Sequence, residues 1–209
     1  MTELDNNRVS IVIEVSEGLA AKIKKINIVG NSIFTEKRLL KEFKLSTTGL
    51  LSFYTNDDQY SKQKVAGDLE TLRSFYLDDG YLNFNLDSTQ VSITPDKMGI
   101  YIAINITEGV QYTVTEVKLA GQYILPEKDI FELITIESEN LFSRKKITDS
   151  TKSITEKLGT EGYSFANVNS IPEINKEDKT VSLTFFVDPG KRVYVRRINF
   201  SGNAKTIPK

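Results

Sequence analysis

The stretch Glu108-Gly109-Val110-Gln111-Tyr112-Thr113-Val114-Thr115-Glu116-Val117-Lys118-Leu119-Ala120-Gly121 contains a glycine turn, a short alternating strand and a second glycine. Glycines twelve positions apart occur three times: Gly18 and Gly30, Gly109 and Gly121, and Gly190 and Gly202. Repetition at a fixed spacing is typical of supersecondary units that recur along a chain. The sequence therefore predicts tandem modules, 91 residues long from Gly18 to Gly109 and 81 residues long from Gly109 to Gly190.

The composition favours a folded chain without catalytic machinery. Of the 209 residues, 39% are apolar, and 27 basic residues balance 28 acidic ones, so the chain lies far from the disordered class. It contains no Cys, His or Trp, which excludes thiol nucleophiles, Cys/His zinc sites and Ser-His-Asp triads. The glycines lack the spacing of a phosphate-binding loop, and acidic pairs such as Asp57-Asp58 are interpreted as solvated loop charges. We therefore expect no enzyme activity, cofactor or metal.

Charge and hydropathy also bear on partners and location. Residues 191–209 carry six basic residues and no acidic one, but the rest of the chain carries 21 basic and 28 acidic residues. This charge distribution is a poor footprint for nucleic acid. No apolar run reaches the length of a spanning helix, and residues 1–30 lack a signal-peptide pattern. If the protein is exported, we expect this sequence to be an internal fragment that begins with an added Met1.

The first complete module is expected over residues 19–109. It begins with a strand at 23–29, continues with a short helix capped by Thr35, and has a longer helix at 61–77 that ends before Gly80. A strand follows in which Leu82, Phe84 and Leu86 alternate on one parity and Val91 and Ile93 on the other, so a β-bulge is predicted at residues 87–90. Isoleucines at 100, 102, 104 and 106 predict the central strand.

The second module repeats this order over residues 110–190. It has strands at 114–120 and 181–187, two helices between Pro126 and Gly162, and a strand at 163–174 that Pro172 demotes to a sheet edge. The predicted fold class is α+β: tandem β-α-α-β-β modules, each a three-stranded mixed sheet with two helices packed on one face. Residues 1–18, with a strand at 8–15, are interpreted as the end of a preceding module. Residues 191–209, with a strand at 193–200, are interpreted as the start of the next.

If the isoleucine strand is central, the strand before it forms an open edge of its sheet. Such an edge offers backbone N–H and C=O groups to a further strand, although a bulge there is equally a device against pairing. The loop at 49–58 carries apolar residues that either form a contact patch or fold back over their own helices: Leu50, Leu51, Phe53 and Tyr54.

Several segments of the chain resemble the BamA family of outer-membrane β-barrel assembly proteins: residues 63–74, 87–97, 105–109, 172–175 and 194–197. The resemblance covers nearly the whole chain and implies that its modules are POTRA domains. On this basis residues 1–18 end the second repeat, 19–109 are the third, 110–190 are the fourth and 191–209 begin the fifth. A membrane-embedded β-barrel would follow in the family but is absent from this sequence.

The resemblance implies a non-enzymatic scaffold at the periplasmic face of the outer membrane of a Gram-negative bacterium. Its expected partners are unfolded outer-membrane proteins and accessory lipoproteins, without nucleic acid. In the family the lipoprotein BamB docks on the edge strand of the third repeat, which implies a partner-binding strand here made of Asp87, Ser88, Thr89, Gln90, Val91 and Ile93.

Three alternatives stay open at this point. In the first alternative, the modules act as a spacer that sets the geometry between other domains, and the residues at the module junctions matter most: Glu17, Gly18, Glu108, Gly109, Pro189 and Gly190. In the second, the chain is the POTRA region of a related two-partner secretion or translocation transporter. The strands at 8–15 and 193–200, expected to lack their own sheets, also suggest self-association.

Overall fold

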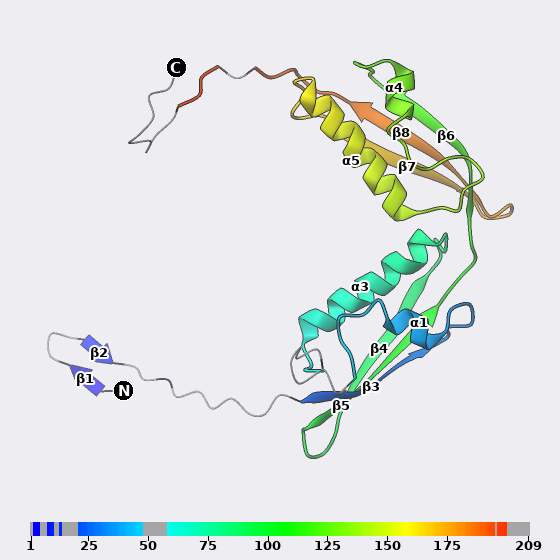
Figure 1. Ribbon diagram of the computed structural model, residues 1–209. Helices are drawn as coiled ribbons and strands as arrows, with labels where there is room; N and C mark the ends of the chain where they lie inside the picture. Colours follow the sequence, from blue (N-terminus) through cyan, green and yellow to red (C-terminus); the bar gives the residue numbers. More distant parts are fainter. Residues whose placement is uncertain are drawn as a thin grey trace. The chain divides into compact units, whose positions relative to one another are not determined.

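The structure is a computed structural model that describes residues 2–4, 8–10, 13, 21–47, 58–194 and 196–199. The chain divides into two compact units. One contains Met1–Leu69 and Asp87–Asn105, and the other contains Glu70–Leu86 and Ile106–Lys209. Two three-stranded sheets organise these residues, each with its own helices (Figure 1).

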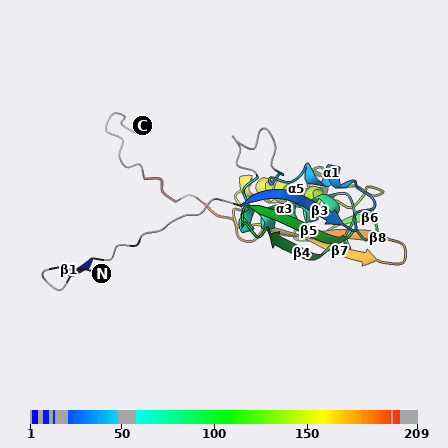
Figure 2. The same cartoon turned by 90° about the horizontal axis from the view of Figure 1, so that it is seen from below.

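The first sheet has the strand order β3-β5-β4, formed by β3 (Lys22–Val29), β5 (Gly99–Thr107) and β4 (Asn85–Ile93). Figure 2 shows these three strands side by side in that order. Strand β3 runs parallel to β5, and the tight turn between β4 and β5 makes those two antiparallel. Strand β5 is therefore the central strand, as its alternating isoleucines predict. Its four isoleucines are all buried: Ile100, Ile102, Ile104 and Ile106.

Two helices accompany the first sheet: α1 (Glu36–Leu40) and α3 (Lys62–Asp78). The Thr35 side chain accepts a hydrogen bond from the Arg38 N–H and so caps α1, as the sequence predicts. Beyond the end of α3, Gly80 has φ +91°, the left-handed conformation that favours glycine after a helix. Its carbonyl then accepts from the Tyr112 N–H at 2.9 Å.

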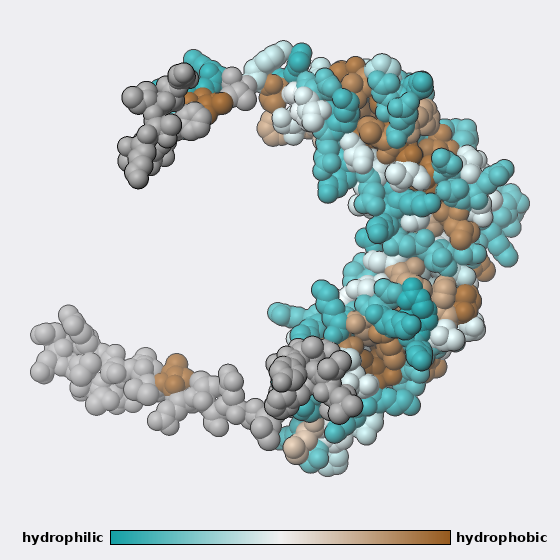
Figure 3. Space-filling model, viewed as in Figure 1, coloured by the Kyte–Doolittle hydropathy of each residue, from teal (hydrophilic) through white to brown (hydrophobic). Residues whose placement is uncertain are grey.

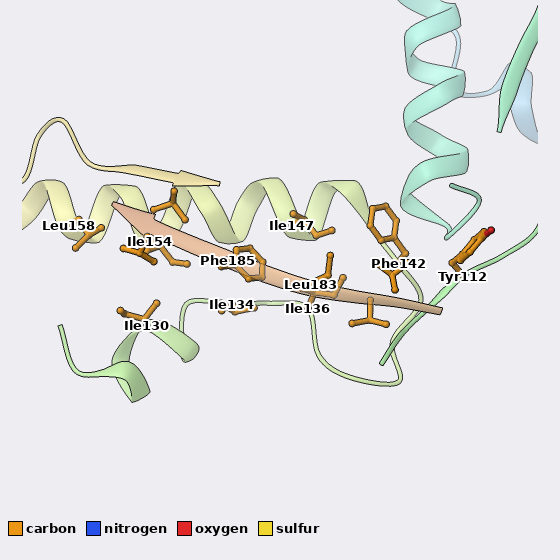
Figure 4. Packing of buried hydrophobic residues seen from close by; sticks show 14 residues of the cluster. Tyr112, Ile130, Ile134, Ile136, Phe142, Ile147, Ile154, Leu158, Leu183 and Phe185 are labelled. Atoms are coloured by element: carbon orange, nitrogen blue, oxygen red, sulfur yellow. The ribbon is translucent and has the colours of Figure 1, made fainter. Parts of the chain in front are cut away.

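The second sheet repeats the arrangement with the order β6-β8-β7, formed by β6 (Thr113–Gly121), β8 (Thr180–Asp188) and β7 (Asn167–Asn175). Strand β8 is central, parallel to β6 and antiparallel to β7. Helices α4 (Glu127–Phe131) and α5 (Arg144–Thr160) pack against it. Ile130, Ile154, Leu158, Leu183 and Phe185 meet in its core (Figure 4). The predicted α+β fold with repeated β-α-α-β-β modules is thus confirmed.

Between Ser88 and Thr94 the contacts of β4 with β5 show no sign of the predicted β-bulge, and at residue 87 the bulge stays a prediction. The Thr94 N–H donates to the Gly99 carbonyl at 2.9 Å, and Asn105 Nδ2 donates to Ser88 Oγ at 2.8 Å. Six residues separate these contacts on each strand, from 88 to 94 and from 99 to 105, so neither strand has an insertion between them. The described register shifts lie instead at the starts of β3 and β6.

The strand predictions at the two ends of the chain also need correction. Residues Arg8–Ser10 do form a strand, β2, but it pairs antiparallel with β1 (Thr2–Leu4), so it has a partner within the chain. Ile13 is exposed, and the remainder of 8–15 lies outside the described residues. The described residues between 193 and 199 form no strand. A strand needs a hydrogen-bonded neighbour, and the one backbone bond described there joins the Val193 N–H to the Gly162 carbonyl.

Candidate strand-binding edge

Strand β4 is an edge strand: within the described residues, β5 is its only neighbour in the sheet. The Thr94 N–H points toward β5, where it donates to Gly99. Backbone groups of successive residues in an antiparallel strand point to opposite sides. The N–H and C=O groups of Thr89, Val91 and Ile93 therefore point away from β5, toward the open side.

The side chains of β4 give its two faces different chemistry. The unbroken register places Val91 and Ile93 on the same face as the buried isoleucines of β5, yet 38% of Val91 and 61% of Ile93 remain exposed. The opposite face is polar. There Gln90 and Ser92 line a shallow hollow together with residues of β3 and β5: Lys25, Asn27, Tyr101, Ile102 and Ala103. A strand added to β4 would thus meet apolar groups on one face and polar groups on the other.

The turn between β4 and β5 fixes this register. The Asp96 carboxylate accepts hydrogen bonds from the Thr94 hydroxyl and from the Met98 N–H. These two hydrogen bonds, the Thr94 one first, hold the pKa of Asp96 below its ordinary value. Gly99 follows the turn at a crowded position. A Cβ there would lie 3.0 Å from Thr94 Cγ2 and 3.1 Å from Lys24 Cγ, so a larger residue would have little room.

The outer edges of β3 and β6 are partly covered at their starts. In the first sheet the Ile23 N–H donates to the Asp58 carbonyl at 2.8 Å, and Gln59 bridges to Lys22. In the second sheet residues 139–142 bond to the backbone of Tyr112 and Val114. No such cover is described over residues 88–93 of β4 or over β7, so these are the more open edges of the two sheets. No periodic signal in the sequence marks the covering segments.

Asp58 shows where the interpretation of acidic pairs as solvated charges was wrong. Its side chain is buried, and its Oδ2 accepts from Lys22 Nζ at 3.0 Å. The ion pair with Lys22 compensates the burial of this loop carboxylate. Lys22 is 36 residues away in sequence, so no local pattern reveals the pairing. The remainder of the loop predicted at 49–58 lies outside the described residues.

Glu108 and Gly109, predicted as junction residues, lie against the end of α3. Buried Glu108 accepts a 2.7 Å hydrogen bond from the Tyr76 hydroxyl. Burial first, and then this hydrogen bond, raise the pKa of Tyr76 above its ordinary value. Gly109 has φ +77°, and a Cβ there would lie 3.0 Å from Asn83 Cβ. Glu108 and Gly109 are therefore held against the end of α3 and the residues that follow it.

The other predicted junction residues are less informative. Gly190 has φ +64°, and its N–H donates to Asp188 Oδ1 at 3.0 Å. Pro189 beside it is buried. Glu17 and Gly18 lie outside the described residues.

The described part of the chain holds no group of three or more His, Cys, Asp or Glu residues placed to bind a metal ion. None of its helices is both long enough and apolar enough to cross a membrane. On the face shown in Figure 3, polar residues in teal divide the apolar residues in brown into small groups. Scattered apolar groups of this kind are normal on a folded domain, which leaves the sheet edge as the feature to explain.

Comparison with known families identifies this fold. The POTRA model, described as surface antigen variable number repeat, matches residues 21–109 and again residues 112–190. The chain belongs to this family, and each match covers one of the two sheets with its helices.

Two relatives are outer membrane protein assembly factors named BamA. The chain is 30% identical over 207 residues to the one from Neisseria meningitidis serogroup B, and this alignment covers 99% of this chain and 26% of that protein. It is 37% identical over 205 residues to the one from Buchnera aphidicola, and this second alignment covers 96% of this chain and 33% of that protein. The chain thus spans between a quarter and a third of these relatives.

Among solved structures, the chain resembles the POTRA3-5 fragment of Haemophilus influenzae BamA. The TM-score is 0.73 at 26% identity, and the match covers 90% of this chain and 74% of that one. The resemblance to the BamA family noted in the sequence is therefore confirmed.

Proposed function

We propose that this chain is part of a periplasmic scaffold for outer-membrane protein assembly and that it binds partner proteins by strand addition along β4. The assembly role is supported by the BamA relatives, of which this chain represents only a portion. The similarity to a POTRA3-5 fragment supports assigning residues 19–109 to the third repeat and residues 110–190 to the fourth.

The observation that carries the proposal is the open side of β4. Thr89, Val91 and Ile93 each direct one donor and one acceptor outward, so a guest strand could form six backbone hydrogen bonds. Each such bond contributes about 0.5–1.5 kcal/mol net, and ordering the guest offsets part of that sum. The exposed side chains of Val91 and Ile93 add apolar contact on one face only.

This asymmetry defines the guest. A strand that alternates apolar and polar residues would place its apolar side chains beside Val91 and Ile93 and its polar ones beside Gln90 and Ser92. Segments of unfolded outer-membrane barrels have this alternation, because one face of each strand meets lipid and the other the barrel interior. We expect an edge segment of the accessory lipoprotein BamB to be a second guest of the same site. Asp87 and Ser88 would lie at the far end of the guest strand.

The paired substitution Val91→Asp with Ile93→Asp tests the proposal. We expect at least about tenfold weaker binding of purified BamB and of a barrel-strand peptide, because two carboxylates would replace the apolar contact. Ile171→Asp is the matched control, since Ile171 is a half-exposed isoleucine of β7 in the other sheet. Isothermal calorimetry gives the affinities, and circular dichroism checks the fold. Unchanged affinity in a folded double variant would overturn strand addition at β4.

A spacer role is the second candidate, and the packed junction favours it. Gln111 Nε2 donates to the Asp79 carbonyl at 2.8 Å, and the Tyr112 N–H donates to Gly80. If the chain acts only as a spacer, variants of β4 would leave outer-membrane assembly in cells unchanged, whereas Gln111→Ala would alter it without changing peptide affinity.

A further inference from the structure

Strand β7 holds the same place in the second sheet that β4 holds in the first. Both strands are nine residues long and form the open edge beside the central strand. Ile171 and Ile174 of β7 are 50% and 45% exposed, so this edge also carries accessible apolar groups. By these features alone, β7 should accept a guest strand as readily as β4.

The registers of the two hairpins show where the edges differ. In the second sheet Ile174 lies opposite Val181 and Pro172 opposite Leu183. Val181 and Leu183 carry the first two buried side chains of β8, as Ile100 and Ile102 do in β5 after the buried Gly99. The register of β4 places Ile93 and Val91 opposite those two isoleucines. Pro172 therefore stands at the position that Val91 occupies in the first sheet.

This match matters because Val91 is the middle one of the three residues with outward backbone groups. Proline has no N–H, and its ring occupies the space into which that hydrogen would point. The outward positions of β7 are Val168, Ser170, Pro172 and Ile174, so the row of donors lacks one of its two inner members. A guest strand would leave one carbonyl without a donor and would meet the ring at the centre of the edge.

We propose that Pro172 is a specificity-determining residue that closes β7 to guest strands and confines strand addition to β4. The proposal rests on the proposed function, because it concerns the choice between two edges for the same kind of guest. Proline on an exposed edge is a known protection against unwanted pairing. One chain would then hold one guest strand, in the first sheet, although it has two sheets of the same design.

The test compares the wild-type chain with Pro172→Val. The probe is a nine-residue peptide of alternating valine and threonine with terminal lysines, titrated into each ¹⁵N-labelled protein and followed by amide NMR. For the wild type we expect one equivalent of peptide, with shifts over β4. For Pro172→Val we expect a second equivalent with shifts over Ser170 to Ile174, because valine restores the donor and favours a strand. Binding to β7 should tighten at least about tenfold.

Two further variants complete the design. Val91→Pro places the same obstacle in β4 and should abolish binding there, so that the double variant Val91→Pro with Pro172→Val binds one peptide on β7. Pro126→Val, before α4 and away from the sheet edge, should behave as the wild type.

The possible outcomes separate this proposal from the proposed function. If the wild type binds one peptide on β4 and Pro172→Val still binds only that one, the role of Pro172 is refuted and strand addition at β4 stands. If the wild type binds nothing but Pro172→Val binds on β7, strand addition at β4 fails and the blocking role of Pro172 stands. If neither protein binds, both proposals are refuted.

Discussion

Tyr76 shows how much one buried side chain contributes to the packing around the end of α3. It has no exposed surface, and its ring stacks on Phe84 with centroids 4.3 Å apart. The Tyr81 ring contacts the Tyr76 ring edge-on, with centroids 5.8 Å apart. The Tyr76 hydroxyl donates a hydrogen bond to buried Glu108. Two aromatic neighbours thus hold the ring whose hydroxyl donates to a buried carboxylate, and such a carboxylate is costly to leave without hydrogen bonds.

Tyr76→Phe should lower the free energy of unfolding by about 1–3 kcal/mol, because it removes a hydrogen bond to a buried charged group. Urea unfolding at pH 7 measures this loss. Tyr101→Phe, at a half-exposed position, is the control and should change stability little. Equal stability of the two variants would contradict the importance of the hydroxyl.

The pH dependence follows from the same residue. Because the pKa of Tyr76 is raised above its ordinary value of 10.0, the folded protein keeps this proton when the unfolded chain loses it. The stabilisation is complete below pH 10 and declines as the pH rises above it. Burial raises the pKa of Tyr81 in the same direction, so the slope above pH 10 should become shallower in Tyr76→Phe but should not vanish.

At this scale the sequence predicts chemistry better than contacts. It places Glu108 at a glycine turn; the structure shows no turn there, although Gly109 does have a positive φ. The partner of Glu108 is 32 residues away in sequence, on α3. Asp58 likewise pairs with Lys22, 36 residues away. Such pairings depend on tertiary packing, so local pattern alone could not predict that these carboxylates are buried.

Among the elements, the end of β6 is the tightest point of the second sheet. Gly121 has φ +101°, and a Cβ there would lie 2.1 Å from the Val187 carbonyl oxygen. The glycine that closes the repeated stretch is therefore required by both backbone conformation and close approach to the central strand.

Gly121→Ala should consequently lower the free energy of unfolding by about 2 kcal/mol or more, since it adds a clash to an unfavourable φ. Gly159→Ala in α5 is the matched control, because nothing lies within 4 Å of its added Cβ. That variant should be neutral or stabilised by about 0.5–1 kcal/mol, the usual preference for alanine in a helix. Thermal unfolding of both proteins checks the difference, and a similar loss in both would argue against the close approach.

Element prediction succeeded where periodicity was long and failed where apolar residues occupy a turn. The alternating isoleucines identify β5, and Pro172 correctly marks β7 as an edge. Leu82 and Phe84 imitate strand alternation but precede β4. Phe84 is buried there because it stacks on Tyr76. Leu82 and Phe84 therefore do not belong to the strand, and of that parity only Leu86 lies within β4.

For the whole chain, repetition of one module explains most of what the sequence reveals. The two sheets share strand order, helix order and buried central strand. What the repeat does not predict is the difference between their edges, because this appears only when the registers of β4 and β7 are compared. The pairing of Arg8–Ser10 with Thr2–Leu4 also removes the reason to expect self-association through an unpaired strand at 8–15.

The central claim, strand addition along β4, is tested most directly by hydrogen–deuterium exchange of backbone amides in the free chain and in its complex with BamB. Exchange resolved by NMR distinguishes alternate residues of one strand. We expect strong new protection at Thr89, Val91 and Ile93, whose N–H groups point to the open side, and little change at Ser88, Gln90 and Ser92. Protection confined to the junction around Glu108 and Gly109, or no new protection in β4, would contradict it and favour the spacer role.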